Sequence, residues 1–449
     1  MKLTRRTLSV ALLAALIAPV AHAEIAIDVI GNSEVSFEGL LQADYNGFDN
    51  DFVNLNGDLP DGEEGDNELR RAELVLKGKG PGNFEWVAGY DAKADRFLDV
   101  NLKYKLGGNG NHFVQVGQFK QPNSLEELSS TKNNDFISKA TVTNTFGIAR
   151  RVGAAYRFAD VNWGVTASYF GRTLNRGGDI VASSGVINTP AFRPAVGSEG
   201  HGTGFGVRGN WAPINETGNI LHFGLSYINI DTDNDVSRIR ARPQADLSGL
   251  RLVDTGVLRN TDRQSTIGAE AMWIVNQFKV QGEYMQSTLD RYNVGTTTAA
   301  SLINDDFTGN SWYVSGLWNI TGETWGYKDG VPTTPLPTNP ASGMWQVGVR
   351  YDSIDLNDGR AIPGATPLAS STISGVLGGE MDAWTVGVNW YWRSNFKVML
   401  NYVMLESDRY FVRTPAFPVA SNRAQGNLLV NREISDNPNV LEARLQFYW

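Results

Sequence analysis

Arginine residues at a spacing of two stand out between residues 238 and 242. Arg238, Arg240 and Arg242 would share one face if this segment is extended, because side chains alternate along an extended backbone. A guanidinium group presents a planar fork of donors that matches two oxygens of a phosphate or a carboxylate. The spacing therefore predicts an anion-binding surface. Further arginines expected at the same end of the molecule are Arg70, Arg71, Arg150, Arg151 and Arg251.

Six lysines occupy the opposite ends of predicted strands. They are Lys77, Lys79, Lys103, Lys105, Lys279 and Lys397. We expect them to converge on the second mouth of a passage, where their ammonium groups act as point charges that attract anions. The alternative is that all these cations are ordinary solvated charges that balance acids such as Glu73, Glu85 and Asp99.

The segment from 120 to 132 has the composition of a structured loop. Ser124 is a candidate N-cap for a short helix, with Glu127 as its capping-box partner. We expect this loop to fold into the passage as a constriction; the alternative is a loop packed on the outside. The side chains that an anion would meet in this region are Lys120, Ser129, Ser130, Lys132, Lys139 and Asp99.

The elements that must position these side chains are β-strands with two different faces. In the last segment, Leu441 and Leu445 share one face with the terminal Trp449, whereas Glu442 and Arg444 share the other. Apolar residues on one face and polar residues on the other are typical of strands that separate lipid from a water-filled lumen. The aromatic end also resembles the C-terminal signature that outer-membrane barrels present to their assembly machinery.

The same alternation recurs along the chain. It predicts one all-β unit, a transmembrane antiparallel β-barrel of about sixteen strands. A barrel of that size leaves an aqueous channel, and its strands must close into a ring because an open edge finds no hydrogen-bond partner in hydrocarbon. The predicted strands begin near residues 33, 68, 83, 96, 112, 148, 161, 203, 219, 265, 277, 310, 343, 382, 395 and 437.

The connections between these strands alternate between short and long. Short turns are typical of the periplasmic side of such barrels and long loops of the extracellular side, which orients the molecule. The predicted long loops cover 46–66, 120–147, 172–202, 230–264, 353–381 and 406–436. One exception is the Pro-rich connection 320–342, which falls on the periplasmic side.

Composition and the first residues narrow the class of protein. A cationic start, an apolar run and Ala21-His22-Ala23 predict a secretory signal peptide over 1–23, followed by a barrel over 24–449. The net charge of −9 argues against a nucleic-acid partner. The absence of cysteine excludes disulfides, thiol catalysis and Cys-ligated zinc. No metal or cofactor is expected.

Several short stretches, spread over nearly the whole mature chain, form a recognisable set. They are Gly117-Gln118-Phe119-Lys120 with Pro122, Ser124-Leu125-Glu126 with Ser129-Ser130, Arg240-Ala241-Arg242-Pro243 with Val253-Asp254-Thr255-Gly256, Leu356-Asn357-Asp358-Gly359, Val386-Gly387-Val388-Asn389-Trp390-Tyr391, and Arg444-Leu445-Gln446-Phe447. Together they resemble the phosphate-selective porins O and P. The resemblance implies a homotrimer of sixteen-stranded barrels through which phosphate, pyrophosphate or a polyphosphate diffuses.

The resemblance also implies roles for individual residues. The residues that match an extracellular arginine ladder are Arg70, Arg71, Arg238, Arg240 and Arg242, those that match the central constriction are Lys120, Ser129 and Ser130, and Asp99 matches an acid that lines it. The chain departs from similar porins after the constriction loop, where Ser138-Lys139 stands in place of a Glu-Arg pair. A lysine cannot form the bidentate fork, so a general anion porin without a phosphate site is the alternative.

Two other classes of protein compare with a channel, a receptor with a plug and a barrel enzyme. A plug would need a folded domain before the first strand, and only about ten residues separate Ala23 from that strand. A barrel enzyme would need a Ser/His or paired-acid arrangement at the loop rim, and no such arrangement is evident in the sequence. A calcium site in the acidic first loop is an alternative to a solvated loop, its candidate ligands being Asp58, Asp61, Glu63, Glu64 and Asp66. The expected partners are therefore inorganic anions, outer-membrane lipid, lipopolysaccharide and the barrel assembly machinery of a Gram-negative bacterium.

Overall fold

The computed structural model describes residues 25–30, 33–55, 65–107, 111–174, 202–232, 235–292, 305–362, 372–411 and 432–449. The predicted signal peptide over 1–23 lies outside these residues. So do four of the five candidate calcium ligands, since only Asp66 falls within them.

The main sheet contains eighteen strands within this part of the chain. Two of them, β1 (Ile25–Ile30) and β23 (Arg432–Asp436), pair alongside β2 and β22. The remaining sixteen form the ring: β2 (Ser33–Asp49), β3 (Gly65–Lys79), β4 (Phe84–Asp91), β5 (Arg96–Leu106), β6 (His112–Lys120), β7 (Arg150–Ala159), β8 (Trp163–Phe170), β9 (Gly204–Glu216), β10 (Asn219–Asp231), β15 (Thr261–Val275), β16 (Phe278–Arg291), β17 (Phe307–Asn319), β20 (Met344–Ile362), β21 (Thr372–Trp392), β22 (Phe396–Phe411) and β24 (Asn439–Tyr448).

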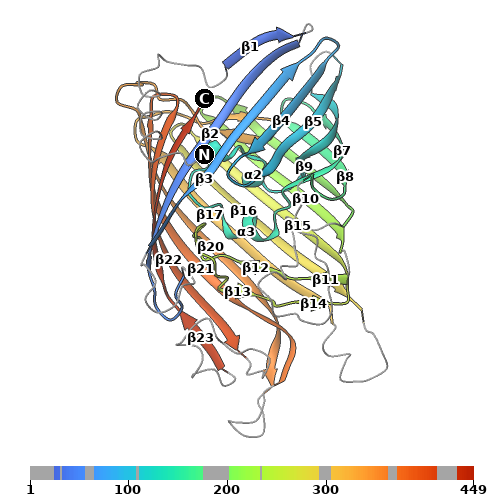
Figure 1. Ribbon diagram of the computed structural model, residues 1–449, viewed down its shortest axis with the longest axis vertical. Helices are drawn as coiled ribbons and strands as arrows, with labels where there is room; N and C mark the ends of the chain where they lie inside the picture. Colours follow the sequence, from blue (N-terminus) through green and yellow to red (C-terminus); the bar gives the residue numbers. More distant parts are fainter. Residues whose placement is uncertain are drawn as a thin grey trace, which may run out of the picture.

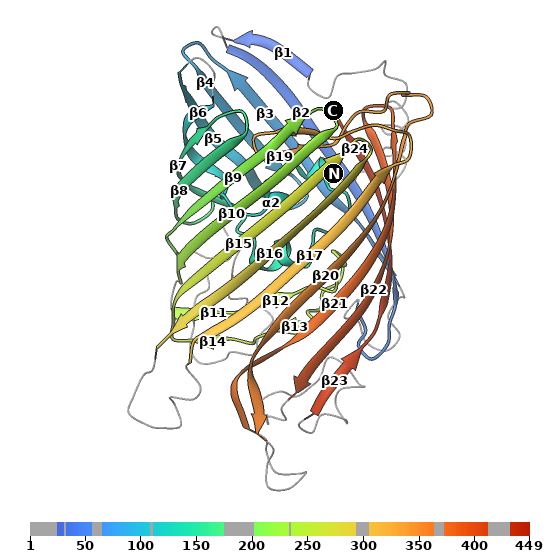
Figure 2. The same ribbon diagram turned by 180° about the vertical axis from the view of Figure 1, so that it is seen from behind.

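The ring is closed by antiparallel pairing between its first and last strands. β2 pairs with β24 from Leu40 opposite Tyr448 to Asp49 opposite Asn439. The strands tilt steeply around a common axis, and β1 lies at the same end of the barrel as the C-terminus (Figures 1 and 2). The prediction of a closed antiparallel barrel of about sixteen strands is confirmed.

The two faces of the strands differ as the alternation predicts. Along β24, Leu441 and Leu445 are exposed on the outer surface, whereas Glu442 and Arg444 are buried on the inner side. Aromatic side chains gather on the outside where strands meet short turns; one example is the stacked pair of Trp345 and Trp390, whose ring centroids lie 5.8 Å apart. Such belts are typical of the boundary between lipid and water.

Most short turns lie at one end of the barrel and most long loops at the other, called here the turn end and the loop end; the short turn between β4 and β5 lies at the loop end, because the strand directions alternate. Several strands reach further toward the loop end than predicted. β20 and β21 pair out to Ile362 opposite Thr372, inside the predicted loop 353–381. The sequence did not predict these strand extensions, because the alternation of apolar residues stops at the membrane boundary. Backbone pairing between strands continues beyond that boundary, in water, without such alternation. The predicted loop boundaries there were wrong.

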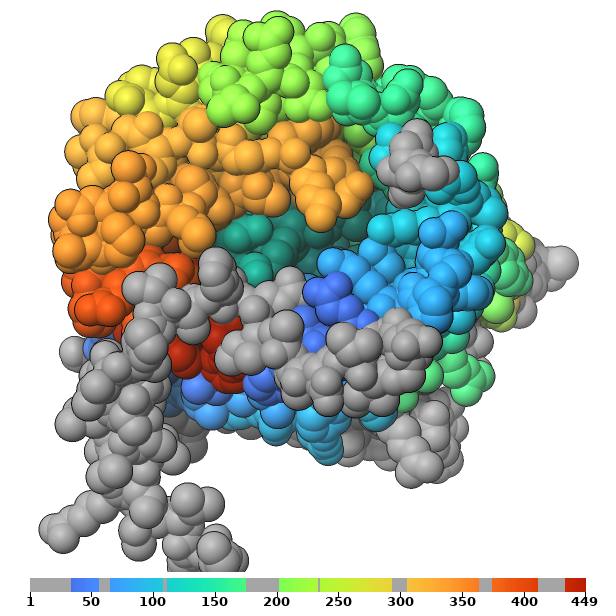
Figure 3. Space-filling view, turned by 90° about the horizontal axis from the view of Figure 1, so that it is seen from above, coloured from blue at the N-terminus to red at the C-terminus, as the bar shows by residue number. Residues whose placement is uncertain are grey.

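Three helical segments lie between β6 and β7: α2 (Leu125–Leu128), η1 (Thr131–Asn133) and α3 (Thr141–Phe146). None of the helices in the described residues is long and apolar enough to cross a membrane. These short elements belong to the connection 121–149, called here the first lumen loop. It lies inside the barrel (Figure 1), and a view from the turn end shows it in teal at the bottom of a hollow (Figure 3). The prediction that this loop folds into the barrel is confirmed.

A second segment that the sequence placed among the outer loops also packs inside. Residues 235–260, the second lumen loop, form two small ladders: β11 (Val236–Ser237) with β14 (Leu258–Arg259), and β12 (Arg240–Ala241) with β13 (Val253–Asp254). Apolar side chains of the two lumen loops and of the barrel wall form one buried cluster, to which Val142, Phe146, Ile239 and Val253 contribute. The interior therefore has a hydrophobic core of its own.

The Pro-rich connection at the turn end folds inward as well. It carries the hairpin of β18 (Gly326–Lys328) and β19 (Val331–Thr333). Trp325 is buried there against Leu125 and Phe136 of the first lumen loop. A guanidinium nitrogen of Arg208 in the wall donates to the carbonyl of Gly330 at 2.9 Å. This connection therefore covers part of the lumen.

Candidate functional site

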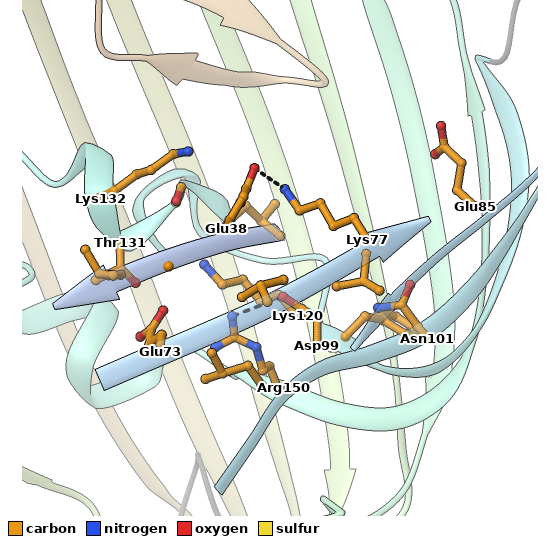
Figure 4. A pocket seen from close by; sticks show the side chains of 18 of the residues that line it. Glu38, Glu73, Lys77, Glu85, Asp99, Asn101, Lys120, Thr131, Lys132 and Arg150 are labelled. Carbon is orange, nitrogen blue, oxygen red and sulfur yellow. Dashed lines mark hydrogen bonds and ion pairs between the residues drawn. The ribbon is translucent and has the colours of Figure 1, made fainter. Parts of the chain in front are cut away.

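A cavity of about 440 Å³ lies between the first lumen loop and the wall formed by β2 to β7 (Figure 4). Its lining carries five cationic and four acidic side chains. They are Lys77, Lys103, Lys120, Lys132, Arg150, Glu38, Glu73, Glu85 and Asp99. The excess of one positive charge in a confined, partly desolvated space favours an anion.

Strand periodicity brings most of these side chains together. Glu73, Val75 and Lys77 follow one another at a spacing of two on β3, and Asn101 and Lys103 do the same on β5. Inner-face residues of neighbouring strands thereby form one charged wall. The first lumen loop supplies the opposite side of the cavity.

Two β-bulges add side chains that strict alternation would turn away. On β3 the pairing with β2 skips Arg70, since Gln42 lies opposite Arg71 and Ala43 opposite Leu69. Arg70 and the neighbouring Arg71 consequently both reach partners inside the barrel. A register shift between β4 and β5 coincides with Leu98 and Asp99, consecutive residues that both line the cavity. The sequence predicted Arg70 and Arg71 at the loop end of the barrel, but alternation along the strand did not explain how both side chains could face inward.

Lys120 ends β6 at the entrance to the first lumen loop. Its ammonium group donates to the carbonyls of Glu127 at 2.5 Å and of Ser129 at 2.7 Å. The charge is thus held at the cavity wall by the loop's own backbone. Ser124 caps α2 as predicted, its hydroxyl accepting from the amide of Glu127 at 3.1 Å, whereas the carboxylate of Glu127, the predicted box partner, pairs with Lys139.

Ser130 and Lys132 line the cavity, and Lys132 has no ion-pair partner among the described residues. Ser129 and Lys139 are not among the lining residues. The hydroxyl of Ser129 donates to the carbonyl of Leu125 at 2.9 Å, which occupies it within α2. Lys139 forms a buried ion pair with Glu127. Both residues hold the shape of the loop in this structure.

The ion pair with Lys139 controls the charge of Glu127. Burial opposes ionisation of this carboxyl group, but the ammonium groups of Lys139 and Lys120 outweigh it and hold the pKa of Glu127 at about 2. Glu127 therefore stays charged from neutral pH down to strongly acidic pH. Because its folded pKa is depressed, the stability contributed by the pair is lost only as the pH falls below the ordinary carboxyl range toward 2.

Arg150 begins β7 and lines the cavity, where it forms an ion pair with Asp99 at 3.1 Å (Figure 4). Arg151, the next residue, is almost fully buried and does not line the cavity. A guanidinium that keeps an acid beside it remains a donor to an approaching oxyanion, because it has five N–H groups and one carboxylate occupies at most two.

The second lumen loop holds the alternating arginines. Burial alternates from Arg238 to Ala241: the arginines are half-exposed, whereas Ile239 and Ala241 are buried. Arg238 forms a bidentate ion pair with Asp254 through two guanidinium nitrogens, one of them at 2.8 Å. Arg242 and Arg70 both approach Asp246 instead. Arg240 lies in β12, and Arg251 donates to the carbonyl of Leu250 at 2.9 Å.

The six lysines fall into two groups. Lys77 pairs with Glu38 at 2.7 Å and Lys105 with Glu85 at 2.6 Å, and both lysines keep more than a third of their side chains exposed. Lys103 lies over the ring of Phe113, and Lys79 is exposed.

Lys279 and Lys397 face inward but are buried beneath the first lumen loop. Lys279 pairs with Asp135 at 2.6 Å, and Lys397 donates to the carbonyl of Asn134. The expectation that these two lysines border the open passage is corrected: they anchor the loop, because the loop covers that side of the wall.

We expect Lys279→Met to lower stability and to leave ion selectivity unchanged. The substitution leaves Asp135 without its ammonium partner in a site where Lys279 is 2% exposed, at a cost of about 3 kcal/mol. Urea-induced unfolding in detergent micelles measures the loss.

The matched variant is Lys77→Met, which removes the same charge from the open cavity. It should lower anion selectivity and change stability by less than about 1 kcal/mol. Equal effects of the two substitutions on selectivity would contradict the division into anchoring and lining lysines.

Sequence reasoning missed the residues that attach the lumen loops to the wall. Glu283 of β16 accepts from the amides of Leu125 and Glu126 at 2.8 and 2.9 Å, which fixes the start of α2. Arg350 and Arg444 perform similar tasks on the other strands. The available signal was an inward charge on an alternating strand. That signal does not reveal whether water or a loop covers the charge.

Comparison with known proteins agrees with this architecture. A family model described as "Phosphate-selective porin O and P" matches residues 35–449. Porin O of Pseudomonas aeruginosa is 24% identical over 402 residues, which cover 84% of each chain. An uncharacterized protein of Caulobacter vibrioides is 26% identical over 354 residues, covering 76% of this chain and 62% of that protein. The outer membrane channel DcaP of Acinetobacter baumannii shares the fold, with a TM-score of 0.50 at 10% identity, over 94% of this chain and 100% of that one.

Proposed function

We propose that this chain, which belongs to the phosphate-selective porin O and P family, is a diffusion channel that selects phosphate or a polyphosphate among the anions it carries. Family and fold together place it in the outer membrane of a Gram-negative bacterium, and they support an anion channel. The turn end is then periplasmic and the loop end extracellular.

The observation that carries the proposal is the charged cavity beside the first lumen loop. Lys120, Lys132 and Arg150 converge there from two sides of a confined space. Ammonium and guanidinium groups together supply both the attraction and the directed hydrogen bonds that a tetrahedral oxyanion needs. The acids in the lining keep the net charge small, so that an anion is attracted without being trapped.

The proposed path runs from the extracellular arginines to the periplasmic lysines. Arg238, Arg240 and Arg242 form the entry, with Arg70 and Arg71 behind them. The solute then passes the central cavity and leaves along Lys77, Lys103 and Lys105. Diffusion down such a row of cations needs no conformational change, since each site releases the anion to the next.

Further features are proposed from the family resemblance and the residue patterns. The chain enters the export pathway through a signal peptide over 1–23 and is inserted by the barrel assembly machinery. The backbone of Trp449 pairs with Gly39 and extends the pairing of β24 with β2 that closes the ring. The barrels form homotrimers surrounded by lipid and lipopolysaccharide, and pyrophosphate is a second solute.

A planar bilayer experiment tests the proposed function. In a gradient of KCl, the reversal potential should have the sign of chloride preference, because the net cationic lining favours anions. Phosphate added at millimolar concentration should then block part of the chloride current, since it binds more tightly than chloride at the same cations.

Two other results are informative. A reversal potential of the opposite sign would overturn the assignment of an anion channel. Chloride preference without any phosphate block would leave a general anion porin, in keeping with the lysine at position 139 and its ion pair with Glu127.

A further inference from the structure

Asp246 of the second lumen loop lies among four arginines. One carboxylate oxygen is 3.3 Å from Nε of Arg70 and 3.6 Å from a terminal nitrogen of Arg444. The other oxygen is 4.0 Å from Arg242, which also donates to the backbone carbonyl of Asp246 at 3.1 Å. Arg71 is the fourth arginine whose charge acts on this carboxylate.

The four arginines differ in how their charges are balanced. Arg444 holds Asp44 in a two-pronged pair with both distances at 2.6 Å, and Arg71 pairs with Glu73 at 3.2 Å. For Arg70 and Arg242, Asp246 is the only acid that forms an ion pair within the described parts of the chain. Asp246 therefore balances the charge of two guanidinium groups, one from the wall and one from the second lumen loop.

This cluster adjoins the proposed anion path. Glu73, the partner of Arg71, lines the central cavity together with Lys120 and Arg150. The side chains of Arg70 and Arg242 keep 22% and 39% of their surface exposed, so that a solute in the lumen can reach them. Asp246 itself keeps 15%.

The carboxylate of Asp246 is charged at neutral pH. Burial alone would raise the pKa of Asp246, but Arg70, Arg444 and Arg242 together hold it at about 2. One of its oxygens faces Arg70 and Arg444, and the other faces Arg242.

We infer that Asp246 is a specificity-determining residue that competes, as a tethered anion, with the permeating oxyanion for Arg70 and Arg242. The inference rests on the proposed function and adds to it a residue that weakens the binding of phosphate to these two arginines. With Asp246 in place, an entering phosphate must displace a carboxylate that the loop keeps at high local concentration. Without the carboxylate of Asp246, the two arginines are open to a bidentate oxyanion. The oxyanion then binds more tightly and dissociates more slowly.

The test is the substitution Asp246→Asn, which keeps the shape and removes the charge. Inorganic phosphate is titrated against the chloride current of the full-length porin in planar bilayers. We expect the half-blocking phosphate concentration to fall about tenfold, as two charge-assisted hydrogen bonds become available. Asp246→Ala should change the block in the same direction.

A control variant tests whether the effect depends on the position of the removed charge. Asp160→Asn makes the same chemical change in an exposed periplasmic turn, where Asp160 accepts only from the amide of Val161 among the described contacts, and it should leave the block unchanged. Adding Arg70→Gln and Arg242→Gln to Asp246→Asn should raise the half-blocking concentration again. Heat-modifiable migration on gels confirms that each variant is folded.

The outcomes distinguish this inference from the proposed function. An anion-selective wild type whose phosphate block is the same in Asp246→Asn and Asp246→Ala would overturn the role of Asp246 and leave the anion channel intact. A cation-selective wild type would overturn both. A tighter block that persists in the triple variant would place the phosphate at other cations and would also refute the inference.

Discussion

Replacing Arg350 with methionine is expected to loosen both lumen loops and to raise the single-channel conductance. Arg350 lies on β20, is 1% exposed, and pairs with Asp352 at 2.6 Å. It donates to the carbonyl of Ser138 in the first lumen loop at 2.9 Å and to the side chain of Gln244 in the second at 2.7 Å. One guanidinium group therefore ties both loops to the wall.

The expected cost follows from the acids left behind. Without Arg350, Asp352 and Glu126 remain in a buried site with less compensating charge, which costs about 3–5 kcal/mol. The wall itself is held by the backbone pairs of the closed ring, so the loss should fall on the loops. We expect a wider, noisier channel together with a lower urea midpoint.

Arg393→Met is the matched control. Arg393 is an exposed residue of the turn between β21 and β22, where its guanidinium lies over the ring of Trp392. The same loss of charge there should leave the conductance unchanged and should change the free energy of unfolding by no more than about 1 kcal/mol. If Arg350→Met behaved like Arg393→Met, the loops would have to be held by other contacts.

Replacing Lys120 with glutamine is expected to lower the ratio of anion to cation permeability several-fold. A unit charge about 8 Å from a permeating ion contributes about 2 kcal/mol at an effective dielectric constant of about 20, which is about 30-fold before screening by salt reduces it to several-fold. Salt screens this interaction, so the effect should be largest at low ionic strength and shrink in concentrated KCl. Glutamine keeps a donor for one of the two loop carbonyls that Lys120 binds.

Lys93→Gln serves as its control. Lys93 lies outside the cavity, in the turn between β4 and β5, and pairs with Glu68 at 3.2 Å. Its substitution should leave the permeability ratio unchanged at every salt concentration. An unchanged ratio in Lys120→Gln would place that charge away from the ion path, and Lys132 and Arg150 would then have to account for the selectivity.

The architecture could be predicted from sequence because a membrane barrel imposes a strict two-residue period. Lipid meets one face of each strand and the interior meets the other, so Leu441 and Arg444 reveal their sides without knowledge of any distant partner. Most strand starts were predicted within a few residues. The ends of β20 and β21 could not be, since beyond the membrane boundary the constraint of alternation disappears.

For the candidate site, the sequence determined which charges face inward, and the tertiary structure decided what covers them. Lys77 and Lys279 follow the same rule of alternation, yet one lines the cavity and the other is buried beneath the first lumen loop. The bulge at Arg70 and the contacts of Asp246 with its arginines are likewise invisible in the sequence. Inward direction is a local property set by backbone geometry, whereas exposure to the solute depends on where loops distant in the chain come to rest.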